Sequence, residues 1–256
     1  MRPILVFDTE TVVDADMARR VVDDAELSDA DALAKVAPPR NDAEAYGFPK
    51  PLYHHVVEIS VCVVSAEGKV EILKPLGPGA GDERTLLQAF WSGFGRHGGT
   101  RLVTYNGRKF DVPVLVQRAL ASGVSPGTIF TGDYRQRFRD SHLDLMEVLS
   151  DYGSSLALSQ HEMATMLGVP GKLGVDGGDV KTLWAEGKTA DIAAYCTCDV
   201  ATLTLCFARM GVHTGWCTDG EEEQIEAGIR EALEALAGGH GLYRAFLAAL
   251  SQEAPR

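Results

Sequence analysis

An apolar run that ends in two carboxylates constrains the fold of this chain most strongly. Residues Ile4–Phe7 are all apolar and are followed at once by Asp8 and Glu10. The run is short and lacks helical spacing, so it predicts a buried β-strand. Residues two apart in a strand point to the same face, so the two carboxylates lie side by side. They repel each other unless a cation lies between them. On its own, the same pattern also fits a solvated strand end.

The rest of the chain predicts an α/β fold. A length of 256 residues suits one α/β domain with insertions. Further strands are expected at residues 56–65, 70–73, 101–105 and 141–145, and helices at 82–95, 110–121, 159–167, 189–210 and 221–237. Hairpin-connected early strands followed by alternating helices and strands predict a mixed β-sheet flanked by helices. The helix at 189–210 is expected to be amphipathic and to end at Gly211.

Two segments have no predicted catalytic role. We expect a single domain over residues 1–256, with an acidic, proline-rich insertion at 11–55 and a C-terminal helical extension at 219–256. Gating of a cleft and self-association both remain open as roles for these segments.

Charge and cysteine content narrow the classes of function. The net charge of −12 argues against a protein that grips long nucleic acid through bulk charge. It is compatible with an enzyme that binds a strand end at a metal centre, because divalent ions reverse the local sign. The five cysteines show no C-x-x-C spacing, so buried reduced thiols are expected rather than a zinc site. No signal-peptide core or bilayer-length apolar stretch is recognised, so we expect a cytoplasmic protein without a membrane partner.

Two further acidic positions lie at expected element ends. The segment Asn106–Asp111 leads from a strand through a turn and places Asp111 at the start of a helix, where an Asp is also favoured for dipole reasons alone. Tyr195 and Asp199 are four residues apart on a helix and therefore share a face. That face is otherwise apolar, so the Asp199 carboxylate requires a cation or strong hydrogen bonds, or else it lies at the rim in contact with water.

The order and spacing of the three motifs resemble those of a known group of enzymes. D-x-E on the first strand, N-x-x-x-F-D after a turn and Y-x-x-x-D on a late helix are typical of the DnaQ-like, or DEDD, exonuclease superfamily. The chain is similar in particular to predicted 3′–5′ exonucleases related to the proofreading domain of family-B DNA polymerases, over roughly residues 4–210. The resemblance implies an RNase H-like fold. One branch of the superfamily has a His five residues before the last Asp; Ala194 occupies that position here, which implies the tyrosine (DEDDy) subtype.

The resemblance also implies roles for individual residues. Asp8, Glu10, Asp111 and Asp199 would bind two divalent cations, and Tyr195 would orient the attacking water or help to deprotonate it. Hard oxygen ligands favour Mg²⁺ or Mn²⁺ over zinc. The expected reaction is hydrolysis at the 3′ end of nucleic acid, single-stranded DNA in the first instance, with release of nucleoside 5′-monophosphates.

Several other positions are candidates for substrate contacts, each with an ordinary structural alternative. They are Thr9, Asn106, Phe110, Asp144 and Lys172. Threonine is also a common strand residue, Asn-Gly is a common turn, and Asp144 is equally suited to a structural hydrogen bond. A basic segment with interleaved aromatic residues, at 134–139, could follow a single strand or form a solvated edge.

Two alternatives to a DNA exonuclease are retained. One is an exonuclease acting on RNA or short oligonucleotides, because no residue that reads the 2′-hydroxyl can be recognised. The other is a non-catalytic nucleic-acid-binding module. Such a module would be expected to lack at least one carboxylate, whereas all four are present together with Tyr195.

Overall fold

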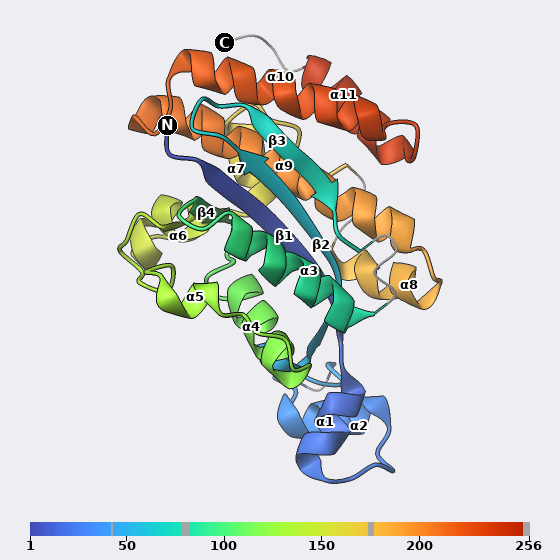
Figure 1. Ribbon diagram of the computed structural model, residues 1–256. Coiled ribbons are helices and arrows are strands. Elements are labelled where there is room, and N and C mark those ends of the chain that lie inside the picture. Colours follow the sequence, from blue (N-terminus) through green and yellow to red (C-terminus); the bar gives the residue numbers. More distant parts are fainter. Residues whose placement is uncertain (42, 78–81, 174–176, 253–256) are drawn as a thin grey trace.

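The computed structural model describes residues 1–41, 43–77, 82–173 and 177–252, and its described strands form one mixed sheet (Figure 1). The strand order is β3-β2-β1-β4-β5. The strands are β1 (Ile4–Val13), β2 (His54–Val64), β3 (Val70–Pro75), β4 (Arg101–Thr104) and β5 (His142–Asp144). β1, β2 and β3 pair antiparallel, whereas β4 and β5 run parallel to β1. The predicted mixed sheet is therefore confirmed.

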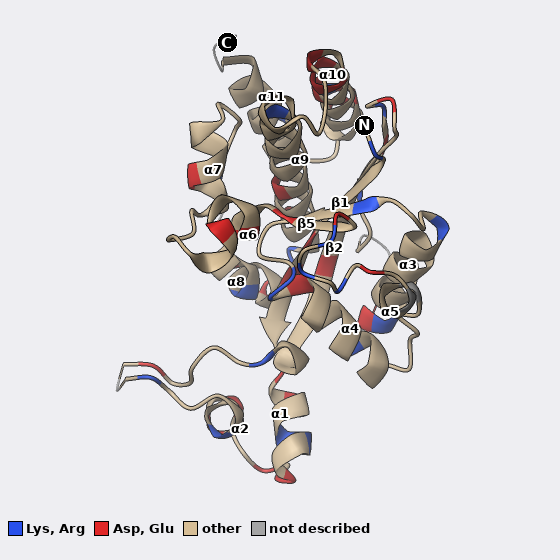
Figure 2. Cartoon of the chain, turned by 90° about the vertical axis from the view of Figure 1, so that its left-hand side faces the viewer, with Lys and Arg blue, Asp and Glu red and all other residues tan. Residues whose placement is uncertain are grey.

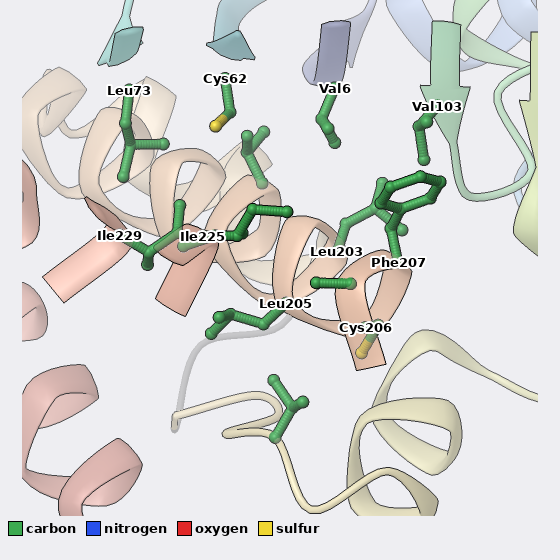
Figure 3. Close-up of a cluster of buried hydrophobic side chains, with 14 of the residues drawn as sticks. Val6, Cys62, Leu73, Val103, Leu203, Leu205, Cys206, Phe207, Ile225 and Ile229 are labelled. Carbon is green, nitrogen blue, oxygen red and sulfur yellow. The ribbon is translucent and has the colours of Figure 1, made fainter. Parts of the chain in front are cut away.

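One face of the sheet packs on a long helix, α9 (Thr189–Thr214). α7 (Gln160–Met166), α10 (Asp219–Leu236) and α11 (Gly241–Gln252) complete this layer. Figure 3 shows side chains from four neighbouring strands, Val6, Cys62, Leu73 and Val103, pointing towards α9. Full burial of an aliphatic or aromatic side chain of this kind contributes roughly 1.5–3 kcal/mol, so this layer is a principal source of stability.

The opposite face is covered by α3 (Glu83–Arg96) and α4 (Asp111–Ala121), with the short α5 (Thr128–Thr131) beside them. Phe7 on β1 packs against Phe90 of α3 with ring centroids 5.0 Å apart. Because the side chains of a strand alternate between faces, β1 directs Leu5 and Phe7 to this layer and Ile4 and Val6 to the α9 layer.

Two features of α9 differ from the sequence prediction. The helix passes Gly211 and ends after Thr214, where Gly215 takes the left-handed conformation (φ 76°). Gly211 instead allows a close approach, because an added Cβ would lie 2.2 Å from Cys217 Sγ. The helix is also buried almost all round rather than amphipathic, since sheet and helices enclose it. By length and composition alone it could cross a membrane, but 83% of its most apolar window is buried within the fold.

The insertion between β1 and β2 forms a small helical unit with its own core. It contains α1 (Ala15–Val22), α2 (Asp29–Val36) and the 3₁₀ turn η1 (Pro51–Tyr53), and it projects from the end of the β1–β2 ribbon (Figure 1). β1 extends to Val13 and β2 begins at His54, so the excursion covers residues 14–53 rather than the expected 11–55. The segment at Thr11–Val13 belongs to the sheet because it pairs with residues 54–56 of β2.

A buried ionic cluster attaches the insertion to the domain. Arg118 of α4 donates to Asp14 Oδ2 at 2.7 Å and to Glu83 Oε2 at 2.6 Å, and also to the carbonyl oxygen of Leu52. Both Arg118 and Glu83 are buried. Removal of one member of such a buried pair is strongly destabilising because it leaves a charge without a partner. The insertion is therefore held firmly at its base.

The remaining elements are short. They are α6 (Leu145–Leu149), α8 (Val180–Ala185), and the 3₁₀ turns η2 (Asp151–Gly153) and η3 (Gly177–Asp179). The C-terminal extension contains two helices, α10 and α11, of which the sequence predicted only the first. All five cysteines are buried and free, as expected.

Candidate active site

The end of β1 emerges from the sheet beyond its parallel neighbour. β1 pairs with β4 only from Ile4 to Val6, whereas its antiparallel pairing with β2 continues past Asp8 and Glu10. The two carboxylates therefore lie at the carboxyl end of a parallel strand pair, the place where α/β sheets usually form their sites. Figure 2 shows acidic segments gathered in the middle of this side of the molecule, between α8 and α4.

α9 crosses this end of the sheet and is held there by specific contacts. Ser60 Oγ on β2 and Thr197 Oγ1 on α9 are 3.0 Å apart and hydrogen-bonded. The Cys196 thiol donates to the backbone oxygen of Asp8 at 3.5 Å. These contacts bring the flanking residues Tyr195 and Asp199 next to the β1 carboxylates. The Tyr195 hydroxyl is hydrogen-bonded to the Asp199 carboxylate, as their four-residue spacing predicts.

The turn after β4 places the remaining carboxylate, that of Asp111, at the start of α4. Asn106 adopts a left-handed conformation (φ 58°), and Gly107 approaches Thr104 so closely that an added Cβ would lie 2.5 Å from the Thr104 Cβ. Asp144 holds this turn by accepting the backbone N–H groups of Asn106 and Arg108, each at 2.9 Å. The chain then enters α4 at Asp111.

Asp111 is also held from the sheet. Thr9 Oγ1 donates to Asp111 Oδ1 at 2.5 Å, and both residues are buried. Thr9 lies between the two acidic residues of β1 and points to the opposite face. The sheet and both helix layers therefore contribute to the same small volume, which contains Asp8, Glu10, Asp111, Asp199 and Tyr195.

Burial and repulsion by neighbouring carboxylates raise the pKa values of Asp8, Glu10 and Asp111. Burial raises the pKa of Asp8 well above its usual range, and the neighbouring charges of Asp111 and Asp199 raise it further. Burial and the charges of Asp8 and Asp199 do the same to the pKa of Glu10. Burial raises the pKa of Asp111 to about 6, although the Thr9 hydrogen bond opposes the shift. The Tyr195 hydroxyl has a raised pKa because it is buried and faces Asp199, so it remains protonated.

This donor set fits divalent cations. Mutually repelling carboxylates in a buried site are stabilised by positive charge between them. All four side chains offer hard oxygen ligands, which suit Mg²⁺ or Mn²⁺. The ligand atoms of Asp8 and Glu10 lie within 4.8 Å of each other and of Cys196 Sγ, a separation that one cation can bridge. Burial keeps the thiol of Cys196 protonated by raising its pKa, so it is a poor ligand beside the carboxylates.

The structure places the other candidate residues in different ways. Lys172 is close enough for its charge to lower the pKa values of Asp8 and Glu10, while Gly174 of the same loop lies outside the described residues. Phe110 caps α4 next to Asp111 and is half-buried. Asn106 Oδ1 is buried without a hydrogen-bond partner in the described part of the chain. Asp144, in contrast, uses both its oxygens to hold the turn, which is the structural alternative considered from the sequence.

Sequence reasoning missed an aromatic group beside the site. Phe48, from the insertion, is 66% exposed and lies 5.6 Å from Phe110 and 5.0 Å from His54, between ring centroids. His54 completes the group with an edge-to-face contact to Phe110 at 4.9 Å. Phe110 is more than 50 residues from Phe48 and His54 in sequence, so no local signal could have found the group.

Fold and site together define a class of protein. A mixed sheet of this order with helices on both faces is an RNase H-like α/β fold, and the matched family places the chain in the DnaQ-like exonuclease superfamily. Residues 46–250 match the model of a family described as predicted 3′–5′ exonucleases related to the exonuclease domain of PolB, and the chain belongs to this family. Asp8 and Glu10 precede the matched residues, so it is the fold that joins them to Asp111 and Asp199.

Solved structures that match this chain include a polymerase and nucleases. The family-B DNA polymerase of the hyperthermophilic archaeon Pyrobaculum calidifontis matches 93% of this chain with a TM-score of 0.54 and 17% identity. Exonuclease I matches 92% of this chain and 46% of its own, with a TM-score of 0.39 and 13% identity. Escherichia coli exonuclease I bound to an oligonucleotide matches 75% and 42% respectively, with a TM-score of 0.38 and 13% identity. This chain spans 29% of the length of the polymerase. No curated protein matches this chain.

Proposed function

We propose that this protein is a 3′–5′ exonuclease that uses two divalent cations, Mg²⁺ or Mn²⁺, to hydrolyse the terminal phosphodiester of single-stranded DNA. The observation that carries the proposal is the convergence of four mutually repelling carboxylates with a protonated tyrosine at the end of β1. The products would be nucleoside 5′-monophosphates. Membership of a family of predicted 3′–5′ exonucleases supports this direction of cleavage.

Each residue of the site has a distinct role in this proposal. Asp8, Glu10, Asp111 and Asp199 would hold the cations, which when bound supply an activated water and stabilise charge on the leaving oxygen. Tyr195 donates a hydrogen bond to Asp199. With an ordinary pKa of about 10, a tyrosine is a poor base at neutral pH. Tyr195 would therefore orient the attacking water rather than remove its proton.

The surroundings suit the end of a single strand. The exposed ring of Phe48 beside Phe110 offers a surface on which an unstacked terminal base can stack. Lys172, exposed and near the carboxylates, would contact a phosphate. The side-chain amide of Asn106 has an unused buried oxygen, which suits a hydrogen bond to the substrate. A paired duplex end presents no free base to such a surface.

The test is digestion of 5′-labelled single-stranded DNA and its RNA equivalent in Mg²⁺, Mn²⁺ or EDTA. Wild type is compared with Asp199→Ala and with Asp191→Ala, a control on the same helix whose side chain pairs with His240 outside the site. We expect a metal-dependent ladder that shortens from the 3′ end in wild type and control, and no ladder for Asp199→Ala. Preference for the RNA strand would favour the RNA-exonuclease alternative. Absence of cleavage of either strand, with no metal binding by calorimetry, would leave a binding module.

A further inference from the structure

A second surface of the protein combines arginines with exposed aromatic rings. It consists of Arg135, Arg137, Phe138, Arg139 and Tyr152, and we call it the arginine–aromatic surface. Phe138 is 77% exposed and Tyr152 is 39% exposed, among the large apolar side chains most accessible to solvent. The surface is formed by the loop before β5 together with η2 after α6. None of these residues has a role in the carboxylate site as described above.

Contacts within the surface hold the rings in place. The Phe138 and Tyr152 rings meet edge to face with centroids 5.1 Å apart. The Arg137 guanidinium lies 5.7 Å from the centre of the Tyr152 ring and donates to the Tyr152 carbonyl oxygen at 3.1 Å. Tyr152 and Asp151 both have positive φ values, 56° and 49°, which non-glycine residues rarely adopt. An exposed aromatic residue held in this conformation indicates that its position matters beyond folding.

Of the three arginines of this surface, only Arg137 has a carboxylate partner among the described residues. Arg137 and Arg108 share one carboxylate, that of Glu147, each at 3.0 Å. Asp140 lies nearby, but its carboxylate is paired with Arg101. Among the described residues, neither Arg135 nor Arg139 has a carboxylate within 4 Å, the limit for an ion pair. Arg135 and Arg139 are therefore available to contact phosphate oxygens of a polyanion.

A cavity extends from this surface to the turn that leads into Asp111. It has a volume of about 150 Å³, and its lining includes Arg137, Phe138, Arg139 and Tyr152, the turn residues Arg108 and Asp144, and the carboxylates of Asp140 and Glu147. Arg108 and Asp144 are the same residues that form the turn leading into Asp111. Arg108 also donates to the His142 carbonyl oxygen at 2.7 Å, which fixes the turn against β5. The arginine–aromatic surface therefore adjoins the turn that places Asp111 at the start of α4.

We propose that the arginine–aromatic surface binds the single strand on the 5′ side of the cleaved nucleotide, with phosphates on the arginines and bases stacked on Phe138 and Tyr152. Alternating basic and aromatic groups are the general means by which proteins bind single strands without reading sequence. The inference rests on the proposed exonuclease function. The proposal implies that the affinity of the protein for single-stranded DNA depends on strand length, because a very short substrate occupies the metal site without reaching the arginine–aromatic surface.

The test compares substrates of two lengths. The double variant Phe138→Ala/Arg139→Gln is compared with Leu120→Ala/Arg20→Gln, which removes an exposed apolar residue of α4 and an exposed arginine of α1. Hydrolysis of a 20-nucleotide single strand and of a trinucleotide is measured at 50 and 200 mM salt. We expect the KM for the long strand to rise about tenfold in the first variant, with kcat unchanged and no change on the trinucleotide. The control should behave as wild type.

A binding measurement separates this inference from the proposed function. Fluorescence anisotropy of the labelled 20-nucleotide strand in EDTA reports affinity without hydrolysis. The slope of log affinity against log salt should become shallower by about 0.7 when the Arg139 contact with one phosphate is lost. Equal effects on both substrate lengths, or unchanged affinity and slope, would overturn the proposal even if wild type digests DNA. A wild type that binds through this surface but does not digest would instead overturn only the nuclease activity.

Discussion

Thr9 Oγ1 donates a hydrogen bond to Asp111 Oδ1 across the end of the sheet, at 2.5 Å. The two residues come from opposite parts of the site, β1 and the start of α4, and both are buried. The bond fixes one carboxylate oxygen of Asp111. In the proposed metal site, Thr9 would orient the ligand Asp111, and loss of such an orienting side chain typically lowers metal affinity 10- to 100-fold.

Replacement of Thr9 tests this role. Thr9→Val keeps the shape and the strand preference but removes the donor, so Asp111 loses its orientation. We expect the affinity for Mn²⁺ to fall about 10- to 100-fold, with little loss of structure. Calorimetric titration measures the affinity, and Thr9→Ser, which keeps the hydroxyl, should restore most of it. Equal affinities for the Val and Ser variants would show that the hydrogen bond has no such role.

Charge removal within the cluster should stabilise the metal-free protein. Asp8 is repelled by Asp111 and Asp199. Asp8→Asn removes one charge while preserving shape, so the unfolding free energy in EDTA should rise. Wild type should in turn be stabilised by Mn²⁺, by about 2.7 kcal/mol at 100 times Kd, and the variant much less. Thermal unfolding with and without Mn²⁺ measures both effects; a variant less stable than wild type in EDTA would contradict the repulsion argument.

Tyr195→Phe should slow the chemical step selectively. The substitution removes the hydroxyl that contacts Asp199 but keeps the buried ring. If Tyr195 orients the water, kcat should fall about 10- to 100-fold while KM stays within twofold, since loss of precise positioning has effects of this size. Tyr53→Phe, at a buried tyrosine in the separate core of the insertion, is the matched control. An unchanged kcat for Tyr195→Phe would assign the hydroxyl a purely structural role.

Local patterns predicted much of this fold. The apolar run before Asp8, the turn at Asn106 and the spacing of Tyr195 and Asp199 are each encoded within a few residues, and the structure brings these motifs together as the resemblance implied. The burial of Ile225, Ile229 and Leu233 on one side of α10 follows from helical periodicity in the same way.

Features that depend on long-range packing could not be predicted. Gly211 would ordinarily end a helix, but the approach of Cys217 makes it a packing position inside α9. The burial of α9 depends in part on α11, and nothing in the sequence of α11 indicates that it packs against α9. Phe48 reaches Phe110 only because the insertion is anchored by Arg118 and Asp14, which are 104 residues apart in sequence.

Glu58 is a further buried acid whose role is structural. It lies on β2, 2% exposed, and its Oε1 accepts the N–H groups of Ile59, Leu76 and Gly77 at 2.9, 3.0 and 2.9 Å. These bonds hold the chain as it leaves β3. Burial nevertheless raises the pKa of Glu58 to about 7 from an ordinary value of 4.5, because the three hydrogen bonds only partly offset the loss of water.

This shift predicts how stability depends on pH. The folded state holds the Glu58 proton more tightly than the unfolded state, so the resulting stabilisation is complete below pH 4.5 and is lost as pH rises to about 7. Glu58→Gln keeps an oxygen that accepts the same three N–H groups but carries no charge at any pH. The unfolding free energy of the variant relative to that of wild type should therefore increase by roughly 3 kcal/mol between pH 4 and pH 8. Urea unfolding of both proteins in EDTA at the two pH values measures the difference, and titration of the carboxylate site cancels because it is common to both. A constant difference across this range would mean that Glu58 titrates with an ordinary pKa in the folded protein.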